Sequence, residues 1–277
     1  MGFGDTSRIN TNVQALQAYN NLNKTNAQLG LRQLRLSTGS RINQAEDDSA
    51  GYSISKKLEA RVRGQAQALA NIGDAKSMLT VAEGSLNSIM EILQTMKEKT
   101  IQAANDSMGT SERTAIGNHL KELSKEIGDI IKDTTFNGTS LFSAGGMNFT
   151  FQVNAEKGDT FAVSIASLSV AVLSIADSDL TVDSATNASA ALGKIDAGIQ
   201  RVADHLAKLG DSQKRLTFKQ ENLTTAMNNY EAARSRIADA DFAKEQMEIV
   251  KLQILQQTGT ASLAQANAAP QSVLSLF

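Results

Sequence analysis

Apolar residues recur at alternating steps of three and four along the first third of the chain. The regular part of this seam runs from Ile72 to Met96. Such spacing places the apolar side chains on one face of a helix and is the heptad pattern of coiled coils. A weaker continuation upstream, with no interrupting proline, extends the predicted helix to about residues 48–105.

A second seam in the C-terminal half repeats every seven residues from Ile195 to Ile237. Polar residues interrupt its intervening positions at Gln213, Gln220 and Arg234, which predicts a thin seam whose register is set by polar side chains. We expect the two long helices to pair antiparallel and to share a core within the chain. The core residues predicted from both seams are Ile72, Leu79, Leu86, Leu93, Ile195, Val202, Leu209, Leu216 and Leu223.

A shorter amphipathic helix is expected between the two seams. It follows a turn at residues 107–111, with Thr110 or Ser111 as its cap. Its apolar face ends before Asn137 and Gly138, a strong turn signal.

Beyond this turn the apolar period changes from 3.6 to 2. Apolar and polar residues alternate over 147–153 and 161–165, around a loop that contains Gly158, which predicts a β-hairpin. Residues 168–180 are expected to add extended chain, and residues 183–189 a connecting loop. The predicted fold is therefore mainly α, a long antiparallel helical bundle or coiled coil from both termini with a small β-hairpin section at about 136–182.

The two ends of the chain are amphipathic but carry little apolar surface. A single helix of this kind has too small an apolar face to be stable alone, so we expect both ends to be disordered in the free chain and to order when packed against other copies. The residues expected to carry this self-assembly are Leu22, Leu29, Leu36, Val250, Ile254, Leu263, Val273, Leu274 and Leu276.

Composition limits the chemistry available to the chain. It has no cysteine and a formal net charge of −2, which excludes disulfides and thiolate metal sites and argues against nucleic acid as a partner. His119 and His205 are far apart and belong to no metal-binding motif. The pair Asp47 and Asp48 precedes a predicted helix, where capping is the expected role. We expect neither an enzyme nor a cofactor.

Residues 1–21 contain no apolar stretch followed by a small-residue cleavage site. The longest apolar run, residues 165–176, is shorter than the roughly 20 residues of a membrane span. We expect no cleaved signal peptide and no membrane insertion, a pattern that indicates a cytoplasmic protein unless another export route is used.

Long segments at both ends closely resemble bacterial flagellin. They are INTNVQALQAYNNLNKT, LRLSTGSRINQAEDDSAGYSISKKLEARVRG, TTFNGTSLF and SRIADADFAKEQMEIVKLQILQQTGTASLAQANAAPQSVLSLF, in the flagellin order and with flagellin-like spacing. The central FQVNAEKGDTFAVSI is similar to the hairpin of short flagellins that lack outer variable domains.

The resemblance implies an extracellular subunit that self-assembles into the flagellar filament for motility. It implies a terminal coiled-coil assembly layer of residues 1–45 and 240–277 and a helical rod layer of residues 46–239. Other copies of the chain would be its main partners. The filament cap, the hook–filament junction proteins, an export chaperone and the flagellar type III export apparatus would be the others, and export by that apparatus needs no cleaved signal peptide.

Many flagellins are also recognised by a Toll-like receptor through a rod-layer helix that matches residues 93–105 here. Strong agonists carry arginine where this chain has Thr95 and leucine where it has Lys99, which argues against recognition. The matching contact positions are Leu93, Gln94, Glu98 and Gln102.

Two other functions fit part of the pattern. A hook–filament junction protein also resembles flagellin at both ends, and the C-terminal ILQQTGTASLAQANAAPQSVLSLF favours flagellin over it. A secreted translocator or adhesin would insert amphipathic helices into membranes, and the lack of a long apolar span argues against that function.

Overall fold

The computed structural model describes residues 11–142 and 145–274, with the backbone alone for residues 269–274. The chain divides into a terminal unit, residues 1–60 with 229–277, and a central unit, residues 61–228. The two boundaries between these units, at residues 60/61 and 228/229, fall inside long helices. The helices are α1 (Val13–Thr38), α2 (Ser49–Ala103), α3 (Thr110–Asp133), the 3-10 helix η1 (Asp177–Asp179), α4 (Ala185–Ala238) and α5 (Phe242–Leu274). The strands are β1 (Thr135–Phe136), β2 (Thr139–Ser140), β3 (Met147–Gln152) and β4 (Thr160–Ile165).

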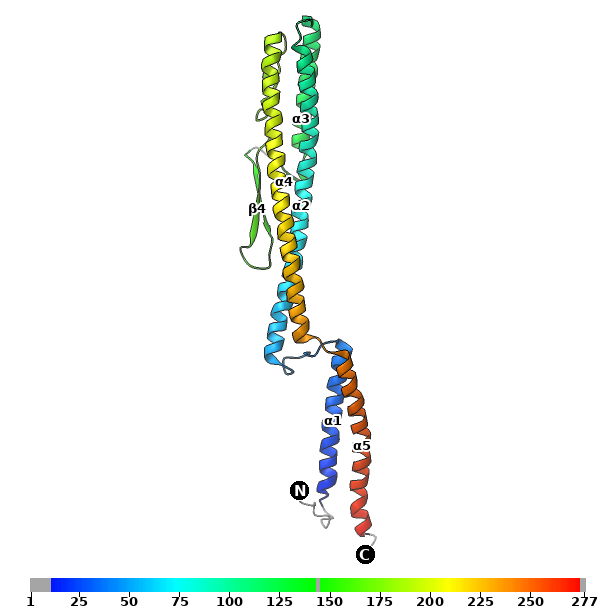
Figure 1. The fold of residues 1–277 in the computed structure, drawn as a ribbon. Coiled ribbons are helices and arrows are strands. Elements are labelled where there is room, and N and C mark those ends of the chain that lie inside the picture. Colours follow the sequence, from blue (N-terminus) through cyan, green and yellow to red (C-terminus); the bar gives the residue numbers. More distant parts are fainter. Residues whose placement is uncertain (1–10, 143–144, 275–277) are drawn as a thin grey trace. The chain divides into compact units, whose positions relative to one another are not determined.

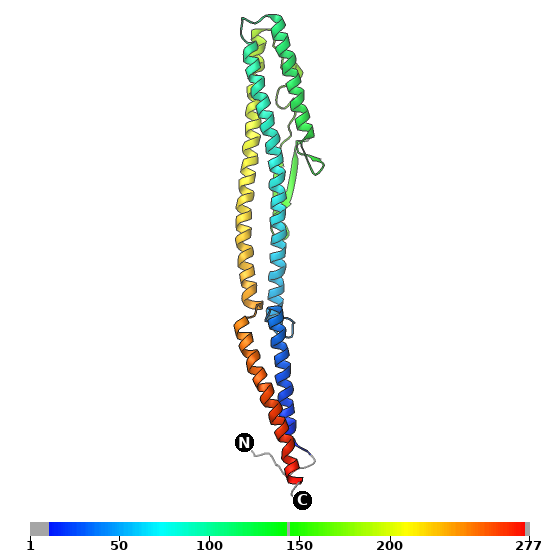
Figure 2. The same ribbon diagram turned by 90° about the vertical axis from the view of Figure 1, so that its right-hand side faces the viewer.

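In the central unit, α2 and α4 run antiparallel and α3 lies beside them, as Figures 1 and 2 show. Their facing sides form one apolar core, which also takes in β4 and the segment that leads to α4. The mainly α fold expected from the sequence is confirmed. All nine residues of the two predicted seams lie in this core, and the most exposed of them, Leu209 and Leu223, are only 6 % exposed.

The helices α2 and α4 begin where short polar side chains accept hydrogen bonds from free backbone amides. Asp48 Oδ1 accepts from the amide of Gly51 at 2.9 Å, so the expected capping role of Asp48 is confirmed. Ser184 Oγ accepts from Asn187 in the same way at 3.2 Å. Because Ser184 caps a helix, α4 starts at Ala185, and the prediction of a loop over residues 183–189 is wrong.

The start of α3 also differs from the prediction. Gly109 is its N-cap residue and no side chain caps it, while Thr110 is already the first helical residue. A glycine accepts the extended backbone of this position without a side-chain cap. The expectation that Thr110 or Ser111 caps this helix is therefore wrong.

Two antiparallel hairpins follow α3. The first joins β1 and β2 through Asn137 and Gly138, whose φ angles of 49° and 78° suit a tight hairpin turn. The second pairs β3 with β4 from Met147 opposite Ile165 to Gln152 opposite Thr160. In β4 exposed and buried residues alternate, so one face packs on the helices as the alternation predicted.

Residues 168–180 are not extended as expected. They form turns and η1, with Ser174 at a φ angle of 61°. Because their apolar side chains fill the core, the backbone folds back and is held by helix side chains. Ser124 Oγ of α3 donates to the carbonyl of Ile175 at 2.7 Å, and Arg201 of α4 donates to Ser174 Oγ at 2.9 Å.

In the terminal unit, α1 and α5 lie side by side and antiparallel (Figures 1 and 2). Leu22 of α1 lies opposite Gly259 of α5, and near the N-terminal end of α1 the side-chain amide Nδ2 of Asn12 donates to the backbone carbonyl of Ala266 at 2.7 Å. Asn12 also caps α1, and Gly39 ends it in the left-handed conformation. The terminal helices α1 and α5 therefore pair within one molecule.

Candidate functional site

The seam between α1 and α5 is thinly packed. No residue of α1 is fully buried. On α5, Glu245, Ile249 and Leu252 are about 5 % exposed. Farther along the pair, a hollow of about 730 Å³ is lined by glutamine, asparagine, serine and alanine side chains of residues 14–21 and 261–266. The part of the seam formed by residues 14–21 and 261–266 therefore contributes little apolar burial.

Several of the residues expected to mediate self-assembly lie in this seam. Leu22, Leu29, Leu36 and Leu263 are half-buried on the facing sides of the two helices. From the sequence, the terminal helices were not expected to have a core within the chain. The structure differs because α1 and α5 each cover one side of the other. Leu276 lies outside the described residues, as do the side chains of Val273 and Leu274.

A second apolar face of α5 points away from the seam. Met247, Val250 and Ile254 are 67 %, 47 % and 56 % exposed. At 3.6 residues per turn these positions cluster about half a turn from the buried stripe that contains Ile249 and Leu252. The helix is therefore apolar on two opposite sides, of which α1 covers one.

A matching outward face exists on α1. Val13 and Leu16 are about half exposed, and Leu31 and Leu34 are 36 % and 38 % exposed. These residues lie opposite the half-buried leucines of the same helix. We call the outward residues of the two helices the outward stripes; they are Val13, Leu16, Leu31 and Leu34 on α1 and Met247, Val250 and Ile254 on α5. Most of these residues were not predicted, because a heptad pattern indicates a single apolar seam on each helix.

Charged side chains join α1, the loop after it and the first turn of α5. Arg32 donates to both carboxylate oxygens of Glu245 at 2.9 Å, and the Glu245 side chain is only 6 % exposed. Arg35 lies 4.0 Å from the same carboxylate and 3.6 Å from Asp47. A paired buried charge of this kind fixes the relative position of the segments that supply it. We call these four residues the charge clasp.

Asp47 also organises the loop. Its Oδ2 accepts hydrogen bonds from the backbone amides of Asn43 at 2.9 Å and Gln44 at 3.1 Å. These bonds, with the nearby Arg35, hold the pKa of Asp47 below its usual value of 3.8. Asp47 therefore binds the loop amides, whereas its neighbour Asp48 caps the helix.

Backbone hydrogen bonds complete the same junction. The amide of Arg41 donates to the carbonyl of Ala238, and the amide of Ala240 donates to the carbonyl of Gly39 at 2.9 Å. These bonds form a bridge between Ser40 and Asp239, so the two connecting loops of the terminal unit are held together.

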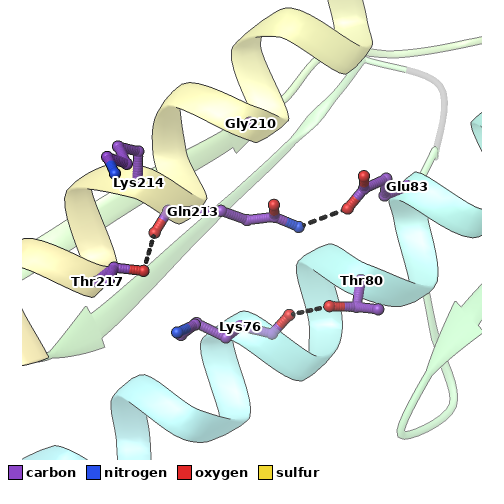
Figure 3. Close-up of a pocket in the computed structure, with 7 residues that line it drawn as sticks. All are labelled: Lys76, Thr80, Glu83, Gly210, Gln213, Lys214 and Thr217. Carbon is purple, nitrogen blue, oxygen red and sulfur yellow. Dashed lines mark hydrogen bonds between the residues drawn. The ribbon is translucent and has the colours of Figure 1, made fainter.

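In the central unit a polar hollow of about 390 Å³ lies between α2 and α4 (Figure 3). Gln213 of α4 donates to Glu83 of α2 at 2.8 Å, and Lys76 of α2 donates to Gln220 of α4 at 3.3 Å. Both glutamines are positions that interrupt the heptad seam. They pair the helices at one register, as expected.

The last turns of α2, to which the resemblance assigns the receptor contacts, contribute to the core. Leu93 is completely buried, so it is not a surface contact in this structure. Gln94, Glu98 and Gln102 are exposed on the same helix.

Neither histidine lies in a metal site. His119 is exposed and His205 is half-buried, with its pKa lowered by burial and by the nearby Lys208. Among the residues that the structure describes, no group of histidine and carboxylate side chains is arranged to hold a metal ion. No helix within the same residues is long and apolar enough to cross a membrane.

Comparison with known proteins decides the family. The bacterial flagellin N-terminal helical region matches residues 9–146, and the bacterial flagellin C-terminal helical region matches residues 192–277. The chain belongs to the bacterial flagellin family. It is a structural subunit of the flagellar filament, and neither the junction protein nor the translocator is favoured by any of these matches.

Relatives of this flagellin match over nearly their whole length. A flagellin from Halalkalibacterium halodurans is 37 % identical over 271 residues, which cover 97 % of this chain and 99 % of the relative. The flagellar filament 33 kDa core protein of Treponema phagedenis is 34 % identical over 283 residues, with the same coverage.

A solved structure supports the fold of this flagellin. It is of a Vibrio parahaemolyticus protein provisionally described as flagellar hook-associated, and it matches with a TM-score of 0.61 at 18 % identity. The match covers 70 % of this chain and 100 % of that protein. At this identity the likeness concerns the helical fold alone.

Proposed function

We propose that this flagellin polymerises through the outward stripes of α1 and α5, and that neighbouring copies in the filament cover them. The observation that carries the proposal is the pair of apolar faces on each terminal helix. One face meets the other helix of the same chain, and the other leaves residues such as Ile254 about half exposed. Burying exposed apolar surface is the main driving force of association.

The thin seam supports coupling between folding and assembly. Because α1 has no fully buried residue, little free energy is available within one molecule to offset the conformational entropy of its 26 residues. A second apolar contact, supplied by another copy, adds the missing burial. Residues 1–45 and 240–277 are thereby assigned to the assembly layer and residues 46–239 to the rod layer.

Different outward faces favour an open filament. The stripes of α1 and α5 differ in sequence, so a contact between them on two copies is heterologous and does not need to close into a dimer. Repetition of such a contact generates a helical polymer, which is the form of a flagellar filament. The main partner of the chain is therefore a second copy of itself.

Other partners follow from the same surfaces and from family membership. Before assembly, an export chaperone covers the C-terminal apolar face, and the flagellar type III export apparatus passes the chain outward without a cleaved signal peptide. At the two ends of the filament the same stripes meet the cap and the hook–filament junction proteins. The lack of cysteine suits this route, since no disulfide has to form or break during export.

Seeded growth of filaments tests the proposal with Ile254→Gln. Replacing this apolar side chain with a polar one removes burial at the interface, and we expect the critical concentration for elongation to rise about tenfold. Gln253→Asn is the matched control, because Gln253 is an exposed polar neighbour on the same helix. Normal elongation of the Ile254→Gln protein would contradict the proposal. If the unsubstituted protein added only a short segment to the seeds and then stopped growing, that would contradict it as well.

A further inference from the structure

The chain contains sulfur only in methionine, since it has eight methionines and no cysteine. Met1 lies outside the described residues. Met78 and Met96 are buried in the central core, at 1 % and 0 % exposure. The remaining described methionines except one are half-buried; they are Met90, Met108, Met147 and Met227.

Met247 is the exception at 67 % exposure, and it lies in the outward stripe of α5. We propose that Met247 is an oxidation site, at which conversion to the sulfoxide weakens polymerisation of the monomer. The proposal rests on the assembly role of the outward stripes and adds to it a chemical control at one named residue.

The reaction needs a peroxide as oxidant. The thioether sulfur attacks one oxygen of hydrogen peroxide, the O–O bond breaks, an S–O bond forms, and the departing oxygen leaves as water after proton transfer. The sulfur is oxidised by two electrons and the peroxide is reduced. Methionine sulfoxide reductases reverse the change.

The consequence follows from the neighbours of Met247. Val250 and Ile254 extend the stripe along the same face of α5, so a copy packed on this face meets apolar carbon at all three positions. A sulfoxide oxygen is a hydrogen-bond acceptor, and burying it without a donor is unfavourable. The nearby Lys251 is already paired with Glu248 at 3.5 Å. Oxidation thus turns an apolar contact into a polar one at the N-terminal end of the α5 stripe.

Assembly protects the same residue. In the monomer the sulfur is accessible to peroxide, whereas in the filament it is covered by the neighbouring copy. The modification therefore acts on subunits before they join and spares those already assembled.

The test treats purified monomer with hydrogen peroxide, maps the oxidised methionines by mass spectrometry and measures elongation from filament seeds. We expect Met247 to oxidise first and the critical concentration to rise about tenfold, which corresponds to about 1.4 kcal/mol per subunit. Treatment with sulfoxide reductases restores growth. Met247→Leu, which keeps the apolar side chain and lacks sulfur, elongates normally before and after peroxide, whereas Met247→Gln elongates poorly without any peroxide.

Two results would overturn the inference. One is normal growth of protein whose Met247 is fully oxidised, and the other is equal inhibition of the Met247→Leu protein by peroxide, which would place the effect at another methionine. Failure of the inference is distinguishable from failure of the proposed function. If Ile254→Gln still impairs elongation, the stripe is an interface and only the redox control fails; if Ile254→Gln is silent as well, the interface itself is misplaced.

Discussion

Single residues of the charge clasp connect the loop after α1 with the start of α5. Glu245 is the centre of this group because two arginines of α1 approach its buried carboxylate. Neutralising it leaves Arg32 without its charged acceptor and Arg35 with Asp47 alone. Removal of one partner from a buried pair costs about 3–5 kcal/mol, and less where the other partner is partly exposed, as Arg32 is.

We therefore expect Glu245→Gln to destabilise the assembled filament by on the order of 2 kcal/mol. The filament should dissociate at a lower temperature, which sedimentation after stepwise heating measures. Unfolding of the central unit in the monomer, followed by circular dichroism, should be unchanged. The exposed ion pair of Lys125 with Glu122 supplies the control Glu122→Gln, which should leave filament stability nearly unaffected. Equal dissociation temperatures for the Glu245→Gln and Glu122→Gln filaments would refute a role for the clasp.

Asp47 gives the clasp a dependence on pH. Its pKa is lowered in the folded form, so the folded form holds the ionised carboxylate more firmly than the unfolded chain does. The resulting stability is present above the unfolded pKa of 3.8 and is lost as the pH falls through the lower folded pKa.

Acid dissociation of filaments, followed by sedimentation, should accordingly be less steep for Asp47→Asn than for the unsubstituted protein. The variant lacks the titrating group, so it should be less stable near neutral pH and should lose less on acidification below about pH 4. Identical acid profiles for the two proteins would show that Asp47 does not contribute.

At the scale of elements, the seams of α2 and α4 show which parts of the fold can be predicted from the sequence. Their apolar residues recur at heptad spacing over many turns, so the helices and their buried faces follow from periodicity. Their polar interruptions, Gln213 and Gln220, also behave as expected, because they bond to side chains across the pair.

Other elements could not be predicted from the sequence because their structure depends on the elements packed against them. Residues 168–180 carry apolar side chains without a clear period, and their backbone turns so that these side chains join the core, where Ser124 of α3 and Arg201 of α4 bond to the segment. The start of α4 was missed because Ser184, a strong cap, stands in a stretch that resembles a loop. Most residues of the outward stripes, Val250 and Ile254 excepted, were missed for a different reason, since an exposed apolar residue in a polar helix resembles ordinary surface until its partner helix is placed.

The central bundle should be stable without assembly. Leu79 is completely buried in its core, whereas Val81, two positions along α2, is 41 % exposed. We expect Leu79→Ala to lower the free energy of unfolding by about 2–5 kcal/mol, through lost burial and the cavity it leaves. Val81→Ala should change it by less than about 0.5 kcal/mol. Denaturant titrations of both monomers by circular dichroism make the comparison, and similar losses would mean that this seam is not the core.

At the scale of the whole molecule, stability is unevenly shared between the two units. The central unit contains nearly all of the completely buried large side chains, while the terminal unit is held by a thin seam, a charge clasp and a short backbone bridge. This division suits a subunit that must stay soluble before it joins a filament. The terminal helices then gain from other copies the apolar cover that they lack within the chain.

Amide hydrogen exchange of monomer and filament tests this coupling most directly. In dilute monomer we expect residues 13–38 and 242–274 to exchange almost as fast as an unfolded chain, while the core positions of residues 61–228 are protected. In filaments the terminal helices should become protected by several orders of magnitude. Strong protection of both terminal helices in the isolated monomer, unchanged on polymerisation, would contradict the account.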